Sequence, residues 1–154
     1  MDFSHLLKAD AVKVLTSVSS KKRLLHEIGA MAHQAHGLNA EHAVEALVER
    51  EALGPTGVGN GVALPHARLS SLTDVVGVFL VLEKPVDFSA IDRQPVDIVF
   101  ALFAPESAGV EHLKALALVS RTLRDSAVRN KLRTNLDASK LYTILSEVDA
   151  VKAA

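Results

Sequence analysis

Two long runs of apolar residues constrain the fold of this chain more than any other feature of its sequence. Residues 75–82 and 96–104 are almost entirely apolar and rich in β-branched side chains, and only Asp97 interrupts the second run. Strands covered on both faces have such continuous runs, whereas half-exposed strands alternate with polar residues. Neither run approaches the roughly 20 apolar residues of a bilayer span. The sequence therefore predicts two strands inside a covered sheet and no membrane-spanning segment.

Residues 21–37 have the periodicity of an amphipathic helix. Ser19 or Ser20 can cap its start, and Gly37 stands where a helix end often needs a left-handed residue. Its apolar residues recur at spacings of three and four, which places them on one face: Leu24, Leu25, Ile28, Met31, Ala32 and Ala35.

A second helix is predicted at residues 40–52. Asn39 can cap it, and Val44, Leu47 and Val48 are expected to face inward. The segment between this helix and the first apolar run reads as a loop, with room for a short strand at residues 61–64. The remaining expected segments are a polar excursion at 85–94 and helices at about 110–124, 126–135 and 138–145.

Helices on either side of continuously apolar strands indicate an α/β fold. We expect a layered single domain, with a central mixed β-sheet flanked by helices on both faces. The chain has 154 residues, of which 49% are hydrophobic and 23% charged, and this composition suits one well-packed domain spanning residues 1–154. Residues 1–4 and 149–154 are expected to fray.

Charge and cysteine content exclude several classes of function. The 17 basic and 18 acidic residues give a net charge of −1, so no field of one sign favours nucleic acid as a partner. The chain has no cysteine, which excludes disulfides, thiolate metal sites and thiol nucleophiles. The N-terminus lacks the pattern of a signal peptide. We expect a cytoplasmic protein that needs no cofactor.

The segment from residue 56 to residue 68 carries the strongest chemical signal. Gly57, Gly59 and Gly61 alternate there, and glycines let the backbone take positive φ and bring N–H groups close to an anion. We expect these glycines, together with Thr56 and Asn60, to line a binding loop. Pro65 fixes the approach to His66. A rigid neutral imidazole is a nucleophile near pH 7, so His66 is a candidate phosphoryl acceptor.

Two common glycine-loop motifs do not match this segment. A Walker loop requires Lys-Ser or Lys-Thr after its last glycine, and the dinucleotide fingerprint requires a strand before and a helix after its glycines. A tight structural loop with an incidental histidine explains the same residues. From the residues alone, this structural alternative and the phosphoryl acceptor carry equal weight.

Other polar residues receive structural interpretations. His26 and His33 lie opposite the apolar stripe and are expected to be solvated. His33 and His36 have a spacing that can ligate a metal, but no third ligand completes a motif, so no metal site is predicted. The acidic residues Asp87, Asp92 and Asp97 are interpreted as loop and strand-edge carboxylates without a catalytic role.

Three blocks of sequence resemble a known family. The first is Arg50-Glu51 followed by TGVGNGVALPH at residues 56–66. The second is FSAIDRQPVDIVFAL at residues 88–102, and the third is EHLKAL at residues 111–116. Together they resemble enzyme IIA domains of the bacterial phosphotransferase system, of the fructose/mannitol/nitrogen-regulatory class. The second block resembles the nitrogen-regulatory branch in particular.

The resemblance implies a role for each matching residue. His66 matches the histidine phosphorylated by the phosphocarrier HPr or its nitrogen-branch paralogue, and His112 matches a supporting histidine. Arg50 matches an arginine near the site, where a guanidinium can pair with phosphate oxygens. His112 also stands in the first turn of a predicted helix, where the dipole favours neutral imidazole. The departures are Pro55, where serine is usual, and Ala67-Arg68 in place of glycine-lysine.

The resemblance therefore implies a phosphotransferase component that carries phosphate on His66. We expect a nitrogen-branch regulator whose phosphorylation state controls targets such as kinases or transporters. The alternative is a fructose- or mannitol-type transport protein that passes phosphate to a separate IIB protein. The chain itself carries neither a cysteine-bearing IIB segment nor a membrane-spanning IIC segment.

Overall fold

A computed structural model gives the structure of residues 2–153, with side chains described for residues 2–148. Its six-stranded sheet has the order β1-β5-β6-β3-β2, and β4 also pairs with β6. The strands are β1 (Val12–Leu15), β2 (Gly57–Gly59), β3 (Val62–Ala63), β4 (His66–Leu69), β5 (Val76–Val86) and β6 (Val96–Pro105).

The two apolar runs form the centre of this sheet. Strands β5 and β6 pair antiparallel, with Phe79 opposite Phe100, while β1 runs parallel to β5. Strands β3 and β4 both run parallel to β6, one after the other along the same edge. The mixed central sheet is therefore confirmed, and both strands extend slightly beyond their predicted ends.

Helices begin and end at the predicted signals. Ser20 accepts a hydrogen bond from the Arg23 N–H, Asn39 accepts one from the His42 N–H, and Gly37 takes a left-handed φ of 71°. The helices are α1 (Phe3–Leu6), the 3₁₀ helix η1 (Ala9–Ala11), α2 (Lys21–His36), α3 (Ala40–Ala52), α4 (Val110–Leu123), α5 (Ser126–Arg133) and α6 (Ala138–Ala153).

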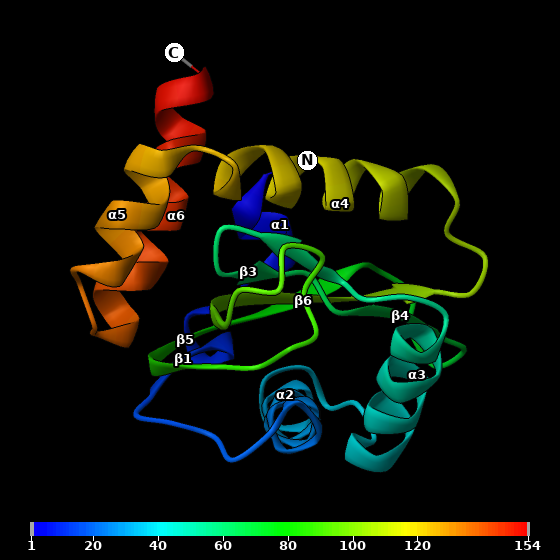
Figure 1. Cartoon of the computed structure of the whole chain (residues 1–154). Helices are drawn as coiled ribbons and strands as arrows, with labels where there is room; N and C mark the ends of the chain where they lie inside the picture. The colour runs from blue at the N-terminus through cyan, green and yellow to red at the C-terminus, as the bar shows by residue number, and fades with distance from the viewer. Residues whose placement is uncertain (1, 154) are drawn as a thin grey trace.

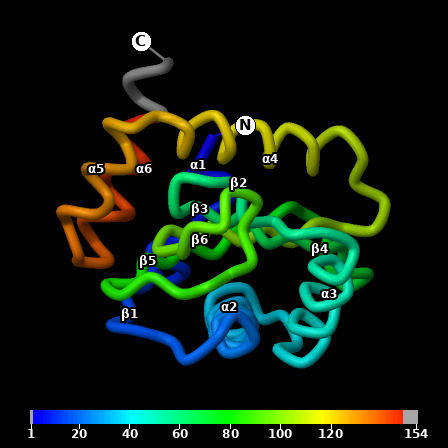
Figure 2. The backbone as a smooth tube through the Cα atoms, in the orientation of Figure 1, coloured from blue at the N-terminus to red at the C-terminus, as the bar shows by residue number. Residues whose placement is uncertain are grey.

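Helices cover both faces of the sheet, as predicted. Figure 1 shows α2 and α3 below the sheet and α4 above it, with α5 and α6 at one side. The tube in Figure 2 shows α2 and α3 on one side of the sheet, and α4, which follows β6, on the other side, where α1 also lies. Strand β6 is the more enclosed of the two long strands, because nine of its ten residues are buried. In the part of the chain that is described, no helix combines the length and apolarity needed to cross a membrane.

Several local predictions were wrong. The expected loop at residues 54–68 also contains the strands β2 and β4, whereas β3 fits the short strand expected at residues 61–64. Strands β3 and β4 pair with the free edge of β6, and β2 pairs with β3. The N-terminal segment was not assigned, yet it forms α1, η1 and β1. Phe3 is 1% exposed and packs its ring against Phe100, so the N-terminus is anchored from Phe3 onward rather than frayed. Val48, expected to face inward, is 45% exposed.

The C-terminal helix also differs from its prediction. We expected it to end near residue 145, and α6 continues to Ala153. Ala154 lies outside the described residues, as do the side chains of residues 149–153, so the predicted fraying of 149–154 stays a prediction.

The contact between α2 and α3 generates the first testable prediction. A Cβ atom at Gly29 would lie 2.5 Å from the Val44 Cγ2 and 3.0 Å from the backbone oxygen of Ala40. Gly29→Val is therefore expected to lower the free energy of unfolding by about 1–3 kcal/mol, the usual cost of overpacking. The shift of the urea midpoint measures this loss.

Ala30→Val is the matched control, because it places the same side chain at an exposed position of the same helix. It should cost only the helix-propensity difference of about 0.5 kcal/mol. Equal midpoints for the two variants would contradict the proposed packing of α2 on α3.

Candidate active site

His66 is held in the sheet by the backbone on both sides of it. It is the first residue of β4 and stands opposite Leu102 of β6. The carbonyl of Pro65 accepts a hydrogen bond from the Leu102 N–H at 2.9 Å. The imidazole is half-buried. His66 is therefore a strand residue on a rigid scaffold, whereas the sequence analysis placed it in a loop.

Hydrogen bonds determine which ring nitrogen of His66 carries the proton. Nδ1 lies 2.8 Å from the carbonyl oxygen of Leu64, which can only accept, so Nδ1 carries the proton. Nε2 then has the free lone pair. The Nε of Arg50 donates toward Nε2 at 3.3 Å, in agreement with this tautomer. The nucleophilic nitrogen of His66 is Nε2, directed toward a guanidinium group.

Arg50 lies in the last turn of α3, and a backbone carbonyl just beyond this helix positions its side chain. Its Nη1 donates to the carbonyl of Gly54 at 3.0 Å, just beyond the end of the helix. This bond keeps the guanidinium beside His66 and leaves further N–H donors free for an anion. Arginine presents such donors in a planar fork that matches phosphate oxygens.

His112 is the third residue of the site, and it comes from α4, on the face of the sheet opposite α3. It lies in the first turn of α4, is 5% exposed, and meets the His66 ring edge-on with centroids 5.6 Å apart. Its Nε2 is buried and has no hydrogen-bond partner among the described residues. An orphaned buried polar atom costs about 1–3 kcal/mol, which is tolerated where a ligand supplies the missing partner.

Burial keeps both histidines neutral. Desolvation is the main cause that lowers the pKa of His66, and the positive charge of Arg50 lowers it further. Desolvation also lowers the pKa of His112, followed by the effects of His66 and Arg68. Both values fall below the usual 6.5, so the two imidazoles are uncharged near neutral pH.

The sequence analysis missed a carboxylate that supports this site. Glu51, beside Arg50, has a side chain that is only 6% exposed and pairs with Lys21 at 2.8 Å. It also accepts hydrogen bonds from the backbone and hydroxyl groups of Thr56. Thr56 is 3% exposed, and its carbonyl accepts from the Leu64 N–H at 2.9 Å. These contacts hold Leu64 in place, and the carbonyl of Leu64 orients His66. In the sequence, the signal for Glu51 was its position next to Arg50 in the first block of the family resemblance.

The predicted binding loop divides into two parts. Thr56 is linked to the site through these contacts, but Gly57 and Gly59 are the first and last residues of β2, and Asn60 and Gly61 form the turn between β2 and β3. Along β6, Val62 of β3 pairs with Ile98, and His66 pairs with Leu102, four residues further on. At about 3.3 Å per residue, these two positions are roughly 13 Å apart.

The turn at Gly59–Gly61 is also held by groups other than a ligand. The Asn60 N–H donates to Asp92 at 3.1 Å, and the Asn60 carbonyl accepts from Arg133, which pairs with Asp97 at 2.9 Å. The structure therefore brings together His66, His112 and Arg50, links Thr56 to them through Glu51 and Leu64, and pairs Gly57 with Ala63 in the sheet. It places Gly59, Asn60 and Gly61 elsewhere, because their positive φ values serve a hairpin.

The remaining polar residues have structural roles. Asp87 and Asp92 accept backbone hydrogen bonds in their own loop, in agreement with the interpretation of these acids as non-catalytic. His33 is exposed as predicted, although its Nδ1 bonds the carbonyl of Leu38. His36 is half-buried and bonds the carbonyl of Gly77. Within the described part of the chain, no three His, Cys, Asp or Glu residues converge in a way that could hold a metal ion.

The fold and the site define an α/β domain that presents a neutral histidine with an unprotonated Nε2 next to an arginine and a second, buried histidine. Comparison with protein families identifies the class further. Residues 5–148 match the family described as "Phosphoenolpyruvate-dependent sugar phosphotransferase system, EIIA 2". The chain belongs to this family, as its sequence blocks predicted.

Similar proteins point to one branch of the family. A nitrogen regulatory protein of Bradyrhizobium diazoefficiens is 44% identical over 153 residues, which cover 99% of this chain and 100% of that protein. One of Escherichia coli strain K12 is 37% identical over 150 residues, covering 97% and 92%. The crystal structure of nitrogen regulatory protein IIA-Ntr from Neisseria meningitidis superposes with a TM-score of 0.86 at 35% identity, covering 93% of this chain and 98% of that one.

The lowered pKa values of the buried histidines generate a prediction for stability against pH. A histidine with a lowered pKa binds protons less readily in the folded than in the unfolded chain, so unfolding gains protons. The free energy of unfolding is therefore expected to be constant above about pH 7 and to fall as the pH drops below 6.5. Urea unfolding between pH 7.5 and 5 measures this fall.

Single variants assign the fall to particular histidines. His66→Gln and His112→Gln should each reduce the loss of stability on acidification, as should His36→Gln, because burial lowers the pKa of His36 as well. A pH dependence that is identical in all three variants and the wild type would contradict the neutral state of these side chains.

Proposed function

We propose that this protein is a phosphohistidine carrier whose Nε2 atom of His66 accepts a phosphoryl group from an HPr-type phosphocarrier. The main support is the geometry of His66, with a protonated Nδ1 bound to Leu64 and a free Nε2 facing Arg50. Membership in the EIIA 2 family supports the same chemistry.

The transfer needs no metal or external base. The bond between phosphorus and a nitrogen of the donor histidine breaks while the bond between phosphorus and Nε2 of His66 forms. The Nδ1 proton stays in place, and the positive charge that develops on the ring is stabilised by the carbonyl of Leu64, 2.8 Å away. Phosphoryl transfer depends mainly on such positioning and charge stabilisation.

Arg50 and His112 are proposed to bind the phosphoryl oxygens. The guanidinium lies 3.3 Å from Nε2 and can shift its donors to the oxygens that arrive there. The unpartnered Nε2 of His112, if it carries the ring proton, gains an acceptor when His66 is phosphorylated. Each residue then interacts more strongly with the transferring phosphate than with the free histidine, as catalysis requires.

Exposed apolar side chains flank the site and suit a protein donor. Leu53 follows the end of α3, three residues after Arg50, and is 85% exposed. Val110 and Leu113 lie on either side of His112 in α4 and are 63% and 66% exposed. Large apolar side chains gathered around a reactive group commonly mark a contact with another protein.

We further propose that the phosphorylation state acts as a signal in the nitrogen branch. The relatives described as nitrogen regulatory proteins support this role. A phosphoryl group adds about −1.5 to −2 charges at the partner-facing surface, which can switch binding to targets such as kinases or transporters. The alternative is a sugar-transport role with transfer to a separate IIB protein, which the wider family description favours.

Phosphorylation itself is the first test. The protein is incubated with phosphoenolpyruvate, enzyme I and an HPr-type carrier, using nitrogen-branch and sugar-branch sets in parallel, and its intact mass is followed. We expect one phosphate on the wild type, none on His66→Ala and a reduced rate in His112→Ala. The faster donor set identifies the branch, and ³¹P NMR should place the phosphate on Nε2. Absence of phosphate from both sets would overturn the proposal.

Arg50→Ala tests the phosphate-binding role. Loss of a charge-assisted hydrogen bond of about 1.5–3 kcal/mol should slow phosphorylation by about 10- to 100-fold. The fold should survive, because the buried face of α3 is unchanged. Arg23→Ala is the control, since Arg23 is exposed on α2 and makes only a surface ion pair with Glu27. Equal rates for both variants would remove Arg50 from the mechanism.

A further inference from the structure

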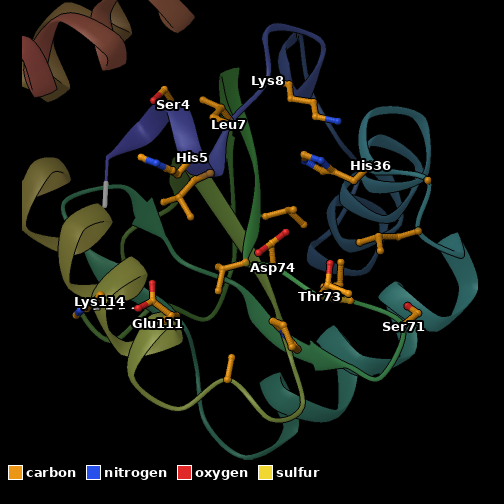
Figure 3. A pocket seen from close by; sticks show the side chains of 18 residues that line it. Ser4, His5, Leu7, Lys8, His36, Ser71, Thr73, Asp74, Glu111 and Lys114 are labelled. Carbon is orange, nitrogen blue, oxygen red and sulfur yellow. Dashed lines mark ion pairs between the residues drawn. The ribbon is translucent and has the colours of Figure 1, made fainter.

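A second cavity lies on the side of α4 that carries Glu111 and Lys114. Its volume is about 890 Å³, within the range of small-molecule pockets. Figure 3 shows side chains from four parts of the chain around it: α1 and the following residues, the end of α2, the segment before β5, and the start of α4. The site described above uses none of these side chains.

Two opposite charges in this cavity have no ionic partner. Glu111 and Lys114 pair with each other at 3.8 Å, and His5 pairs with Asp2 at 2.7 Å. Lys8, by contrast, donates only to the carbonyl of Ala35 at 3.3 Å, and no ion pair in the described part of the chain includes it. Asp74 likewise has no hydrogen bond or ion pair with any described residue.

Neutral polar groups stand beside these two charges. The Nε2 of His36 lies 2.8 Å from the carbonyl of Gly77, which can only accept, so Nε2 carries the proton and Nδ1 is an acceptor. Burial lowers the pKa of His36, which keeps this ring neutral. Ser71 and Thr73 add hydroxyl groups that can donate or accept.

We propose that this cavity binds a small zwitterion of the free α-amino acid class, with its carboxylate on Lys8 and its ammonium group on Asp74. The lining charges of Lys8, Lys114, Asp74 and Glu111 sum to zero, which disfavours a dianion or a polyamine. Lys8 and Asp74 are exposed at the rim of the cavity, and a zwitterion offers each of them a charge-assisted hydrogen bond that no described residue provides.

The cavity is also connected to the proposed phosphorylation site, and this part of the inference rests on the proposed function. Glu111 precedes His112 on α4, and Lys114 lies less than one turn further on. The carbonyl of Ala108, another residue of the lining, accepts from Arg68, which follows His66 by two residues in β4. A bound amino acid therefore contacts the turn that carries His112 and the loop that Arg68 holds, and it should change the rate at which His66 is phosphorylated.

Binding is tested without phosphorylation. Chemical-shift changes in ¹⁵N-labelled protein are followed while the twenty α-amino acids are added singly. Matched carboxylates without an ammonium group and amines without a carboxylate form the other two arms. We expect at least one amino acid, and neither matched analogue, to shift the amides of residues 71–76. Absence of any amino-acid response up to millimolar concentration overturns the proposal, as does equal binding of an analogue.

Charge-neutralising variants locate the ligand. Lys8→Gln and Asp74→Asn should each weaken binding by about 10- to 100-fold, the equivalent of one charge-assisted hydrogen bond. Lys22→Gln, an exposed lysine on α2 outside the cavity, is the matched control and should bind as the wild type does. Unchanged affinity in Lys8→Gln and Asp74→Asn would exclude the cavity as the binding site.

The coupling has its own readout. The initial rate of His66 phosphorylation is measured with and without the bound amino acid, in the wild type and in Asp74→Asn. A rate change in the wild type that Asp74→Asn abolishes supports the connection through α4. Binding without a rate change removes the coupling and leaves the ligand site. If the protein binds the amino acid but is never phosphorylated, that result contradicts the proposed function and leaves the ligand site in the cavity standing.

Discussion

Pairing along both edges of β6 is the constraint on which the rest of the structure depends. One edge holds β5, and the other holds β3 and then β4. The register on the second edge places His66 opposite Leu102 and anchors the preceding Pro65 carbonyl. Because nearly all of β6 is buried, the strand cannot shift without exposing core residues. The position of His66 is therefore determined by a long strand that is almost completely buried.

Sequence reasoning succeeded where the physical signal is local. The apolar runs predicted β5 and β6, and the capping residues Ser20, Gly37 and Asn39 marked the ends of α2 and α3 to within a residue. It failed for β1, β2 and β4, each of which has only three or four residues. Such short strands have no periodicity to detect, and they are stabilised by hydrogen bonds to β5, to β3 and to β6, respectively. Their existence depends on partners that are distant in the sequence.

The candidate site shows the same division. His66 could be proposed as a candidate from the residues around it, but the roles of His112 and Arg50 came only through a family resemblance, since the three residues lie on different elements. The glycine pattern was misleading because positive φ is needed both by an anion-binding loop and by a tight hairpin. Gly59 and Gly61 serve the hairpin, and Arg133 and Asp97 occupy the space beside Gly61. The carbonyl of Leu64, which fixes the tautomer of His66, has no side-chain signature at all.

A phosphate carrier must accept the phosphoryl group readily and also release it. Under the proposed function, partial burial of His66 favours acceptance, because it lowers the pKa of the imidazole and keeps Nε2 unprotonated. Arg50 serves both directions, because the same guanidinium can contact Nε2 before transfer and phosphate oxygens after it. Its neighbour Glu51 is held by Lys21 and Thr56 and keeps a negative charge close to the site. Under the proposed function, that carboxylate disfavours the negative charge of a phosphoryl group on His66 and so favours its release to the next acceptor.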